Sequence, residues 1–329
     1  MPARALGLPA RPADRRGAQR DAARARPDRR ARALRRSSRV RRRRKRGALR
    51  PACRCTVRGA TGPPRAAPAR GADPPAAERA RAAARALVAA IAGRLLLVDA
   101  IVMAAGEGTR LRPLTDRWPK PILPIDGRAV VATLLRELAA AGFARVHVVT
   151  GHLADQVETL LGDGTGFGLE LHYVRQPRAD GSADAVRRAL AAGTEPPALL
   201  LAADTIFTKG DIARFAAAAV DADGALAVRR LPPPAPPHRA AVGIGDGRVV
   251  KVVDDDPANP LASAPLWLLG PRAVPFLADL PGPPYELAEA FQRAVDAGLT
   301  IAGIEIGKTR DLTSPVDLVK ENFPYLGSR

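Results

Sequence analysis

The stretch that decides the fold is Ile101–Ile125, which reads IVMAAGEGTRLRPLTDRWPKPILPI. Its first residues predict a short buried strand, and Gly106 and Gly108 follow directly. Glycine lets the backbone approach a ligand closely and point its N–H groups at it. Arg110 adds a fork of hydrogen-bond donors, and Lys120, which stands between two prolines, adds a point charge. Together these groups predict a binding site for a polyphosphate.

Two other phosphate-binding motifs fit this stretch less well. A Walker A motif ends in Gly-Lys-Ser/Thr, and that ending is missing here. A dinucleotide-binding loop has a third glycine, whose place is held by Leu111. The specific signal is the whole string, in which Gly-x-Gly-Thr-Arg is followed by Pro119-Lys120-Pro121.

This string resembles the nucleotidyltransferases that couple a nucleoside triphosphate to a sugar 1-phosphate and release pyrophosphate. Within that family it is most similar to the glucose-1-phosphate thymidylyltransferases. The resemblance implies that Arg110 binds the β- and γ-phosphates and that Lys120 lies between the α-phosphate and the sugar phosphate. From the residues alone, the alternatives are a surface ion pair for Arg110 and a solvated loop lysine for Lys120. The implied nucleotide-binding loop consists of Ala104, Ala105, Gly106, Glu107, Gly108, Thr109 and Arg110.

The resemblance also implies a Mg²⁺ ion, held by two aspartates and by the phosphates themselves. Asp204 follows an apolar run and matches the family's metal-binding aspartate, with Ala203 in place of the usual glycine. Asp311 matches the second ligand, with Thr309 in place of a common tryptophan. The alternative role for Asp204 is a helix or turn cap. Asp317 is expected at the surface, in the first turns of a helix where an acid is favoured.

The choice of base depends on Leu160–Gly168 and Gln176–Ala183, which parallel the thymidylyltransferases in order and spacing. The resemblance implies that the Gln176 side chain and the Gly181 backbone hydrogen-bond a pyrimidine ring, and therefore that the nucleotide is dTTP or UTP. The alternative is that Asp180-Gly181 is only a turn and that Gln176 is a polar residue at the end of a strand.

The acceptor half departs from the family pattern. The family carries Glu-Lys-Pro, whose lysine meets the sugar phosphate, whereas this chain has Asp255-Asp256-Pro257 after Asp254. A carboxylate in place of a lysine repels a phosphate, and Lys251 is a candidate for the replacement charge. Three functions stay open: transfer to an unusual sugar 1-phosphate, a CTP-dependent transfer to another phosphorylated alcohol such as phosphocholine, and a nucleic-acid-binding protein whose nucleotide domain is degenerate.

The order of apolar runs predicts the fold class. From residue 98 onward, short apolar runs alternate with helical patterns, which predicts an α/β fold with a Rossmann-like, mostly parallel sheet and crossover helices. Ligands in such sheets sit at the carboxyl ends of the strands, so Gly106, Gln176 and Asp204 are expected to converge. The expected strands are 145–150, 169–174, 198–202, 266–269 and 301–306. The expected helices are 127–142, 153–161, 182–192 (with a Ser182 cap), 285–297 and one begun by Ser314-Pro315, and a hairpin is expected over 240–253 with its turn at Asp246-Gly247.

The excess positive charge lies in residues 1–97. This leader has 28 Lys and Arg against 5 Asp and Glu, a net charge of +23, which leaves −4 for residues 98–329 out of +19 for the whole chain. Its run Arg41–Arg46, frequent prolines and scarce aromatic residues predict disorder. Our hypothesis is that translation starts at Val98, because the alternative start codon GTG encodes valine within a longer reading frame. The basic leader would then not belong to the protein, so it gives little reason to expect nucleic acid as a partner.

Cysteine content and hydropathy set the expected compartment. Cys53 and Cys55 both lie in the leader, and they form neither a disulfide framework nor a zinc motif. The apolar stretch 86–105 is too polar for a membrane span. A cytoplasmic protein of residues 98–329 is therefore expected, with a nucleoside triphosphate and a sugar 1-phosphate as its ligands and a homo-oligomer as a possible assembly.

Overall fold

The computed structural model describes residues 98–219, 222–230, 241–254, 256 and 258–323. Residues 1–97, for which disorder is predicted, lie outside the described residues. Their predicted disorder and the predicted start at Val98 therefore stay predictions. Asp255 and Pro257 of the acceptor segment also lie outside the described residues. Within the described part of the chain, no helix is long and apolar enough to cross a membrane.

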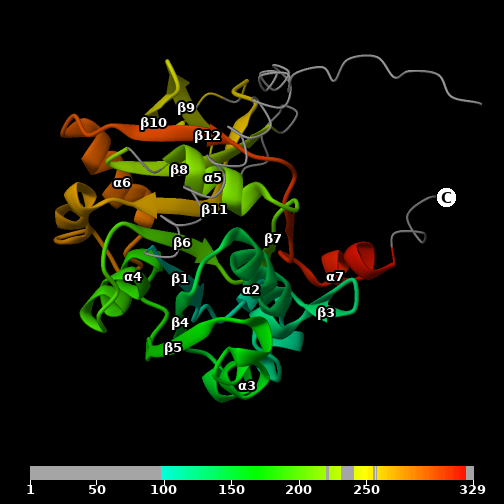
Figure 1. The fold of residues 1–329 in the computed structure, drawn as a ribbon. Helices are drawn as coiled ribbons and strands as arrows, with labels where there is room; N and C mark the ends of the chain where they lie inside the picture. Colours follow the sequence, from blue (N-terminus) through cyan, green and yellow to red (C-terminus); the bar gives the residue numbers. More distant parts are fainter. Residues whose placement is uncertain (1–97, 220–221, 231–240, 255, 257, 324–329) are drawn as a thin grey trace, which may run out of the picture. The chain divides into compact units, whose positions relative to one another are not determined.

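Nine of the described strands form one sheet. In Figure 1 they follow one another from top to bottom in the order β9, β10, β12, β8, β11, β6, β1, β4 and β5. Their bounds are β1 (Asp99–Ala104), β4 (Arg145–Thr150), β5 (Glu170–Arg175), β6 (Ala198–Ala202), β8 (Gly224–Arg230), β9 (Ala241–Gly245), β10 (Arg248–Asp254), β11 (Leu261–Leu269) and β12 (Ile301–Glu305). Two further pairs are short, β2 (Pro124–Ile125) with β3 (Arg128–Ala129) and β7 (Thr205–Ile206) with β13 (Arg310–Asp311).

The parallel pairings gather mainly in the first half of the chain. Strand β1 runs parallel to β4 and to β6, and β4 runs parallel to β5. Strand β11 is antiparallel to both of its neighbours, β6 and β8, so β8 points in the same direction as β1. Strand β12 is parallel to β8, and β10 is antiparallel to β12 and to β9. The predicted α/β fold with crossover helices is confirmed. The sheet is mixed and not mostly parallel, because β10 and β11 run antiparallel to their neighbours.

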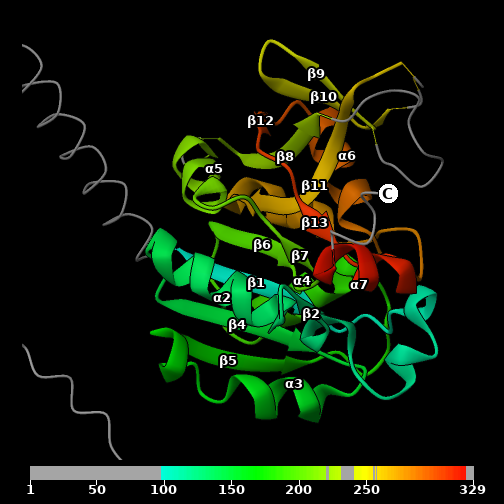
Figure 2. The ribbon, with the colours of Figure 1, turned by 90° about the vertical axis from the view of Figure 1, so that its right-hand side faces the viewer.

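Helices cover both faces of the sheet, as Figures 1 and 2 show. One face, which carries Ala100, Val102 and Ala104, packs against α2 (Val130–Ala141), α3 (Ala154–Leu161) and α5 (Asp211–Ala219). The other face, which carries Ile101, packs against α4 (Ser182–Ala191) and α6 (Leu287–Asp296). Successive residues of β1 thus point into two separate cores, as the strand period of two requires.

The remaining helical elements are short. Helix α7 (Pro315–Asn322) follows β13, and Ser314 and Pro315 begin it as predicted. Asp317 lies in its first turn and accepts the Ser314 N–H at 2.7 Å. The 3₁₀ helices are η1 (Thr109–Leu111), η2 (Leu114–Asp116), η3 (Lys120–Ile122), η4 (Thr165–Phe167) and η5 (Pro271–Leu277).

Most predicted elements have the expected type. Strands β4 and β6 have the predicted bounds, and the predicted hairpin is β9 and β10. Asp246 and Gly247 both have positive φ, 49° and 74°, as a type I′ turn requires.

The predicted serine cap of α4 is wrong. Gly181 occupies the N-cap position and makes no side-chain cap bond. The Ser182 hydroxyl instead donates to Glu286 Oε2 at 2.6 Å and accepts the Leu287 N–H at 2.9 Å. Because Leu287 is the first residue of α6, the serine satisfies a free N–H of that helix rather than of its own.

Candidate active site

The glycine loop, residues 104–110, leaves β1 at the carboxyl edge of the sheet. A Cβ atom added to Gly106 would have no heavy atom within 4 Å, whereas one on Gly108 would lie 2.9 Å from Thr115 Cγ2. Gly108 also has a φ of 64°, and its carbonyl accepts the Thr115 hydroxyl at 2.9 Å. The two glycines therefore differ: Gly108 is required by packing and backbone conformation, while Gly106 faces open space that a ligand can approach.

The charged residues of the loop divide into paired and unpaired groups. Arg112 contacts Glu107 at 3.2 Å and Asp116 at 3.4 Å, and all three side chains are about half exposed. Arg110 is exposed and has no ion-pair partner among the described residues, although a surface ion pair was the alternative to a phosphate-binding role. Arg112 is thus neutralised by its two partners, whereas the Arg110 guanidinium is free to bind an anion.

Lys120 and Asp204 meet at the centre of the site. The Lys120 Nζ atom contacts Asp204 Oδ2, and the two side chains are 21% and 28% exposed. The other oxygen of Asp204 accepts the Thr205 hydroxyl at 3.2 Å. Both residues line a cavity of about 160 Å³, together with Met103, Ala104, Gly106, Gly108, Pro121, Ala202 and Ala203. Lys120 is thus a partly buried, ion-paired residue and not a solvated lysine.

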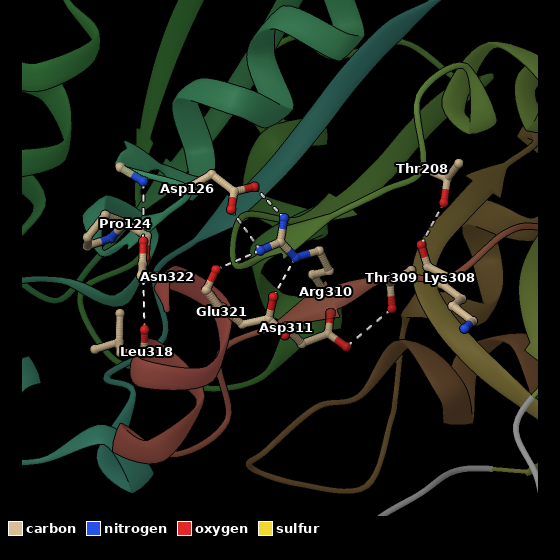
Figure 3. Close-up of polar contacts among 11 residues, drawn as sticks. Pro124, Asp126, Thr208, Lys308, Thr309, Arg310, Asp311, Leu318, Glu321 and Asn322 are labelled. Atoms are coloured by element: carbon tan, nitrogen blue, oxygen red, sulfur yellow. Dashed lines mark hydrogen bonds and ion pairs between the residues drawn. The ribbon is translucent and has the colours of Figure 1, made fainter. Parts of the chain in front are cut away.

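A strand pairing sets Asp311 opposite the residue that follows Asp204. Strand β13 pairs with β7 so that Asp311 is opposite Thr205, the residue after Asp204. Asp311 Oδ2 accepts a bond from Arg229 Nη1 at 2.8 Å, while Asp311 Oδ1 is buried without a hydrogen-bond partner. Figure 3 shows Asp311 beside Thr309, which donates to it at 3.3 Å. A buried carboxylate oxygen without a partner fits a metal ligand, since a cation satisfies it.

The segment that carries Asp311 is held by Arg310, as Figure 3 shows. Its guanidinium binds both oxygens of Asp126 and also contacts Glu321 of α7. The Arg310 hydrogen bond lowers the pKa of Asp126 from its ordinary value. These contacts tie β13 to the β2–β3 turn and to α7, and thereby fix the position of the neighbouring Asp311.

The side chain of Gln176 has a defined orientation at the end of β5. It is 3% exposed, and its Nε2 donates to the Gly181 carbonyl at 3.0 Å and to Asp184 Oδ2 at 2.9 Å. Burial raises the pKa of Asp184, but hydrogen bonds from Arg188 and Gln176 lower it more, so the pKa lies below its ordinary value. The Asp184 side chain is therefore an ionised carboxylate, which can only accept hydrogen bonds. Because both partners are acceptors, the amide nitrogen must face them, and the Gln176 carbonyl oxygen is left for a ligand.

Gly181 is required by a close backbone contact. A Cβ atom there would lie 2.2 Å from the Tyr285 carbonyl oxygen, and its φ is 105°. Tyr285 donates its N–H to Asp180 at 2.7 Å and accepts the Ala183 N–H at 2.9 Å. The segment after Gln176 is therefore positioned by the chain just before α6, which the local turn pattern does not reveal.

The acidic segment of the acceptor half makes local contacts. Asp254 accepts the Asn259 amide at 2.7 Å, and Asp256 accepts the Ala258 N–H at 2.8 Å. Lys251 Nζ lies 3.8 Å from Asp254 Oδ1. Lys251, the sequence candidate for the missing cation, is therefore already paired.

Arg229 is the residue at this edge that sequence reasoning missed. It lies near the carboxyl end of β8, and its contact with Asp311 spans 82 positions of the chain. The only local signal is a pair of arginines after the apolar run 225–228. Which of the two faces Asp311 depends on the register of β8 against its neighbours.

The glycine loop, Lys120 and Asp204 line one cavity, and Asp311 lies on the strand that pairs with β7. Residues 99–251 match the family model described as Nucleotidyl transferase. This part of the chain belongs to the nucleotidyl transferase family. The predicted resemblance is thereby confirmed.

Known relatives match this chain over part of its length. A glucose-1-phosphate thymidylyltransferase of Streptomyces griseus is 29% identical over 68% of this chain and 65% of its own length. A CMP-5'-(3-aminopropyl)phosphonate synthase of Streptomyces rubellomurinus is 36% identical over 52% of this chain and 28% of its own length. The chain thus spans less than two thirds of either relative.

A solved structure shares the fold of the nucleotidyl transferase. The inositol-1-phosphate CTP transferase of T. maritima superposes with a TM-score of 0.59, at 22% identity, over 67% of this chain and 90% of that chain. At this identity the likeness concerns the fold alone.

Proposed function

We propose that the chain transfers a nucleoside monophosphate from dTTP or UTP to a sugar 1-phosphate, forming an NDP-sugar and pyrophosphate. The observation that carries the proposal is the Lys120–Asp204 ion pair, which lines the cavity next to Gly106 at the carboxyl end of β1. A lysine and an aspartate at the mouth of a glycine loop are the groups that a metal-bound triphosphate needs.

The reaction needs positioning and charge neutralisation rather than covalent catalysis. A phosphate oxygen of the acceptor forms a bond to the α-phosphorus, the bond from that phosphorus to the bridging oxygen breaks, and its electron pair leaves with pyrophosphate. Arg110 binds the β- and γ-phosphates through the loop of residues 104–110. Lys120 stabilises the charge that develops between the α-phosphate and the acceptor.

Asp204 and Asp311 are the proposed ligands of Mg²⁺. No group of three His, Cys, Asp or Glu side chains that could hold a metal is present in the described part of the chain, so phosphate oxygens and water complete the coordination. The orphaned Oδ1 of Asp311 supports this assignment. When bound, the ion neutralises charge on the triphosphate and on the departing pyrophosphate.

The orientation of Gln176 favours uracil or thymine. The ring N3 of either base carries a hydrogen, which the Gln176 carbonyl oxygen can accept, whereas N3 of cytosine is itself an acceptor. If cytosine bound, its N3 and the Gln176 carbonyl oxygen would face each other in a buried site, and both acceptors would lack a hydrogen-bond donor. UTP and dTTP are therefore preferred to CTP.

A cytidylyltransferase that acts on another phosphorylated alcohol such as phosphocholine is the second candidate. It is favoured by the 36% identity to a relative named for a CMP product and by the acidic segment at Asp254 and Asp256. A third candidate, a nucleic-acid-binding protein without activity, is supported only by the basic leader.

The test is pyrophosphate release by the full chain with Mg²⁺, measured for UTP, dTTP and CTP against glucose 1-phosphate and phosphocholine. The proposal expects release with UTP or dTTP and the sugar phosphate. Release with CTP and phosphocholine alone selects the second candidate. Release with no pair, together with salt-dependent nucleic-acid binding that is lost on deleting residues 1–97, selects the third.

A further inference from the structure

Each predicted metal ligand is paired with one cation. Asp204 contacts Lys120, and Asp311 contacts Arg229 at 2.8 Å. The β7–β13 pairing sets Asp311 opposite Thr205, the residue that follows Asp204. The two carboxylates are thus matched by two cations, and of these two cations only Lys120 has a role in the function proposed above.

Arg229 lies at the edge of the sheet where the nucleotide site lies. Strand β8 runs in the same direction as β1 and β6, because β11 is antiparallel to both β6 and β8. Arg229 is the penultimate residue of β8, so it lies at the carboxyl edge, as Asp204 does after β6. Ligands of open α/β sheets bind at this edge.

The guanidinium of Arg229 is incompletely bound. Its Nη1 contacts both Asp311 and Thr309, while its Nε is buried without a hydrogen-bond partner. The side chain is 21% exposed. A partly buried guanidinium with an unsatisfied donor has capacity for a further acceptor, and its planar fork matches the oxygens of a phosphate.

Other cations of the acceptor half are engaged elsewhere. Lys251 is paired with Asp254. Arg230, the next residue of β8, makes two bonds to Glu305 at 3.2 Å and 3.1 Å and is 60% exposed. Asp256 stands where the family resemblance places the lysine that meets the acceptor phosphate.

We propose that Arg229 binds the phosphate of the acceptor, a phosphomonoester dianion, and that Asp311 holds Arg229 until a divalent cation draws the carboxylate away. This assignment rests on the proposed function, since it concerns the second substrate of the same site. Binding of a cation by Asp204 and Asp311 weakens both ion pairs, and Lys120 and Arg229 then face the two phosphates that must be brought together. Acceptor binding is thereby coupled to metal binding.

The test uses inorganic phosphate as the probe, because it carries the dianion without fixing the alcohol. Binding to the full chain is followed by ³¹P NMR titration in the presence of Mg²⁺ and α,β-methylene-UTP, which occupies the triphosphate site without reacting. Arg229→Gln is expected to weaken phosphate binding about tenfold to a hundredfold, as the loss of charge-assisted hydrogen bonds does. Arg229→Lys is expected to restore part of it.

A matched control and a metal control separate this role from a structural one. Arg230→Gln changes the same residue type on the same strand and is expected to leave phosphate binding unchanged. In the wild type, phosphate binding is expected to require Mg²⁺. The Asp311→Asn variant, in which Arg229 is released, is expected to bind phosphate without Mg²⁺. Thermal unfolding of each variant shows that it is folded.

Three results overturn the assignment: a wild type that does not bind phosphate, an Arg229→Gln variant that binds it as the wild type does, or an Asp311→Asn variant that binds none without Mg²⁺. Failure of the wild type to bind α,β-methylene-UTP contradicts the proposed function instead. If the nucleotide binds and Arg229→Gln leaves phosphate binding unchanged, the function stands and the assignment of Arg229 does not.

Discussion

Lys120 and Asp204 are 84 positions apart in the chain, and they form an ion pair where β1 and β6 end side by side. The pairing of two parallel strands brings the glycine loop and Asp204, a proposed metal ligand, into one cavity. Neither charge is fully solvated, so each interacts more strongly with a bound phosphate or cation than it would in water.

Lys120→Ala is expected to lower kcat for nucleotide transfer by about a hundredfold to a thousandfold, the effect of removing one group that stabilises developing charge. Pyrophosphate release measures it. Lys320→Ala, an exposed lysine of α7, serves as the control and is expected to keep wild-type turnover. Wild-type turnover in Lys120→Ala would remove this residue from the mechanism.

Gly106→Ala and Gly108→Ala are expected to have different effects. A methyl group at Gly106 contacts no protein atom within 4 Å, so the variant should unfold as the wild type does but with a raised KM for the nucleotide. At Gly108 the positive φ and the close approach to Thr115 should lower the free energy of unfolding by about 1–2 kcal/mol. Urea unfolding together with nucleotide kinetics distinguishes them, and equal stability losses in both would contradict this account.

Gln176→Ala is expected to reduce the preference for UTP over CTP. The variant removes the carbonyl oxygen that accepts the ring N–H, so kcat/KM for UTP should fall about tenfold or more, as is usual when a polar group in a site loses its partner. The ratio of kcat/KM for the two nucleotides is the measurement. An unchanged ratio would mean that another group reads the base.

Stability is expected to fall on acidification through His147. Burial lowers its pKa below the ordinary 6.5, Asp99 opposes this, and His172 and Arg145 lower it further. The unfolded chain therefore binds a proton on His147 near pH 6.5, whereas the folded chain binds it only at a lower pH. The free energy of unfolding is therefore highest above pH 6.5 and decreases as the pH drops from 6.5 toward the pKa of the folded state.

The pH effect is checked by thermal unfolding from pH 8 to about pH 5, within the range in which histidine titrates. In His147→Phe, which keeps a ring against His172, the fall below pH 6.5 should become shallower. A variant with the slope of the wild type would show that another group causes it.

The sequence was informative where local pattern decides the structure. The run 198–202 is wholly apolar and the run 145–150 is rich in valine, and both strands have the predicted bounds. Asp246-Gly247 forms the predicted turn because its conformation requires residues that tolerate positive φ.

Contacts between distant segments escaped prediction for a physical reason. Ser182 precedes a helical pattern and reads as its cap, yet Glu286 and Leu287 compete for its hydroxyl. Arg229 is one of two adjacent arginines, and only the register of β8 against its neighbours selects it to face Asp311. Such choices depend on how elements pack, which no local spacing records.

The central claim is that the α-phosphate of a pyrimidine triphosphate is transferred to an acceptor phosphate. It is tested most directly by incubating the full chain with Mg²⁺, sugar 1-phosphates and UTP labelled with ³²P at the α-position. The account predicts that the label appears in an NDP-sugar, in amounts equal to the pyrophosphate released, and that Lys120→Ala forms it about a hundredfold to a thousandfold more slowly. Label that stays in UTP, or that appears only in free UMP, would contradict it.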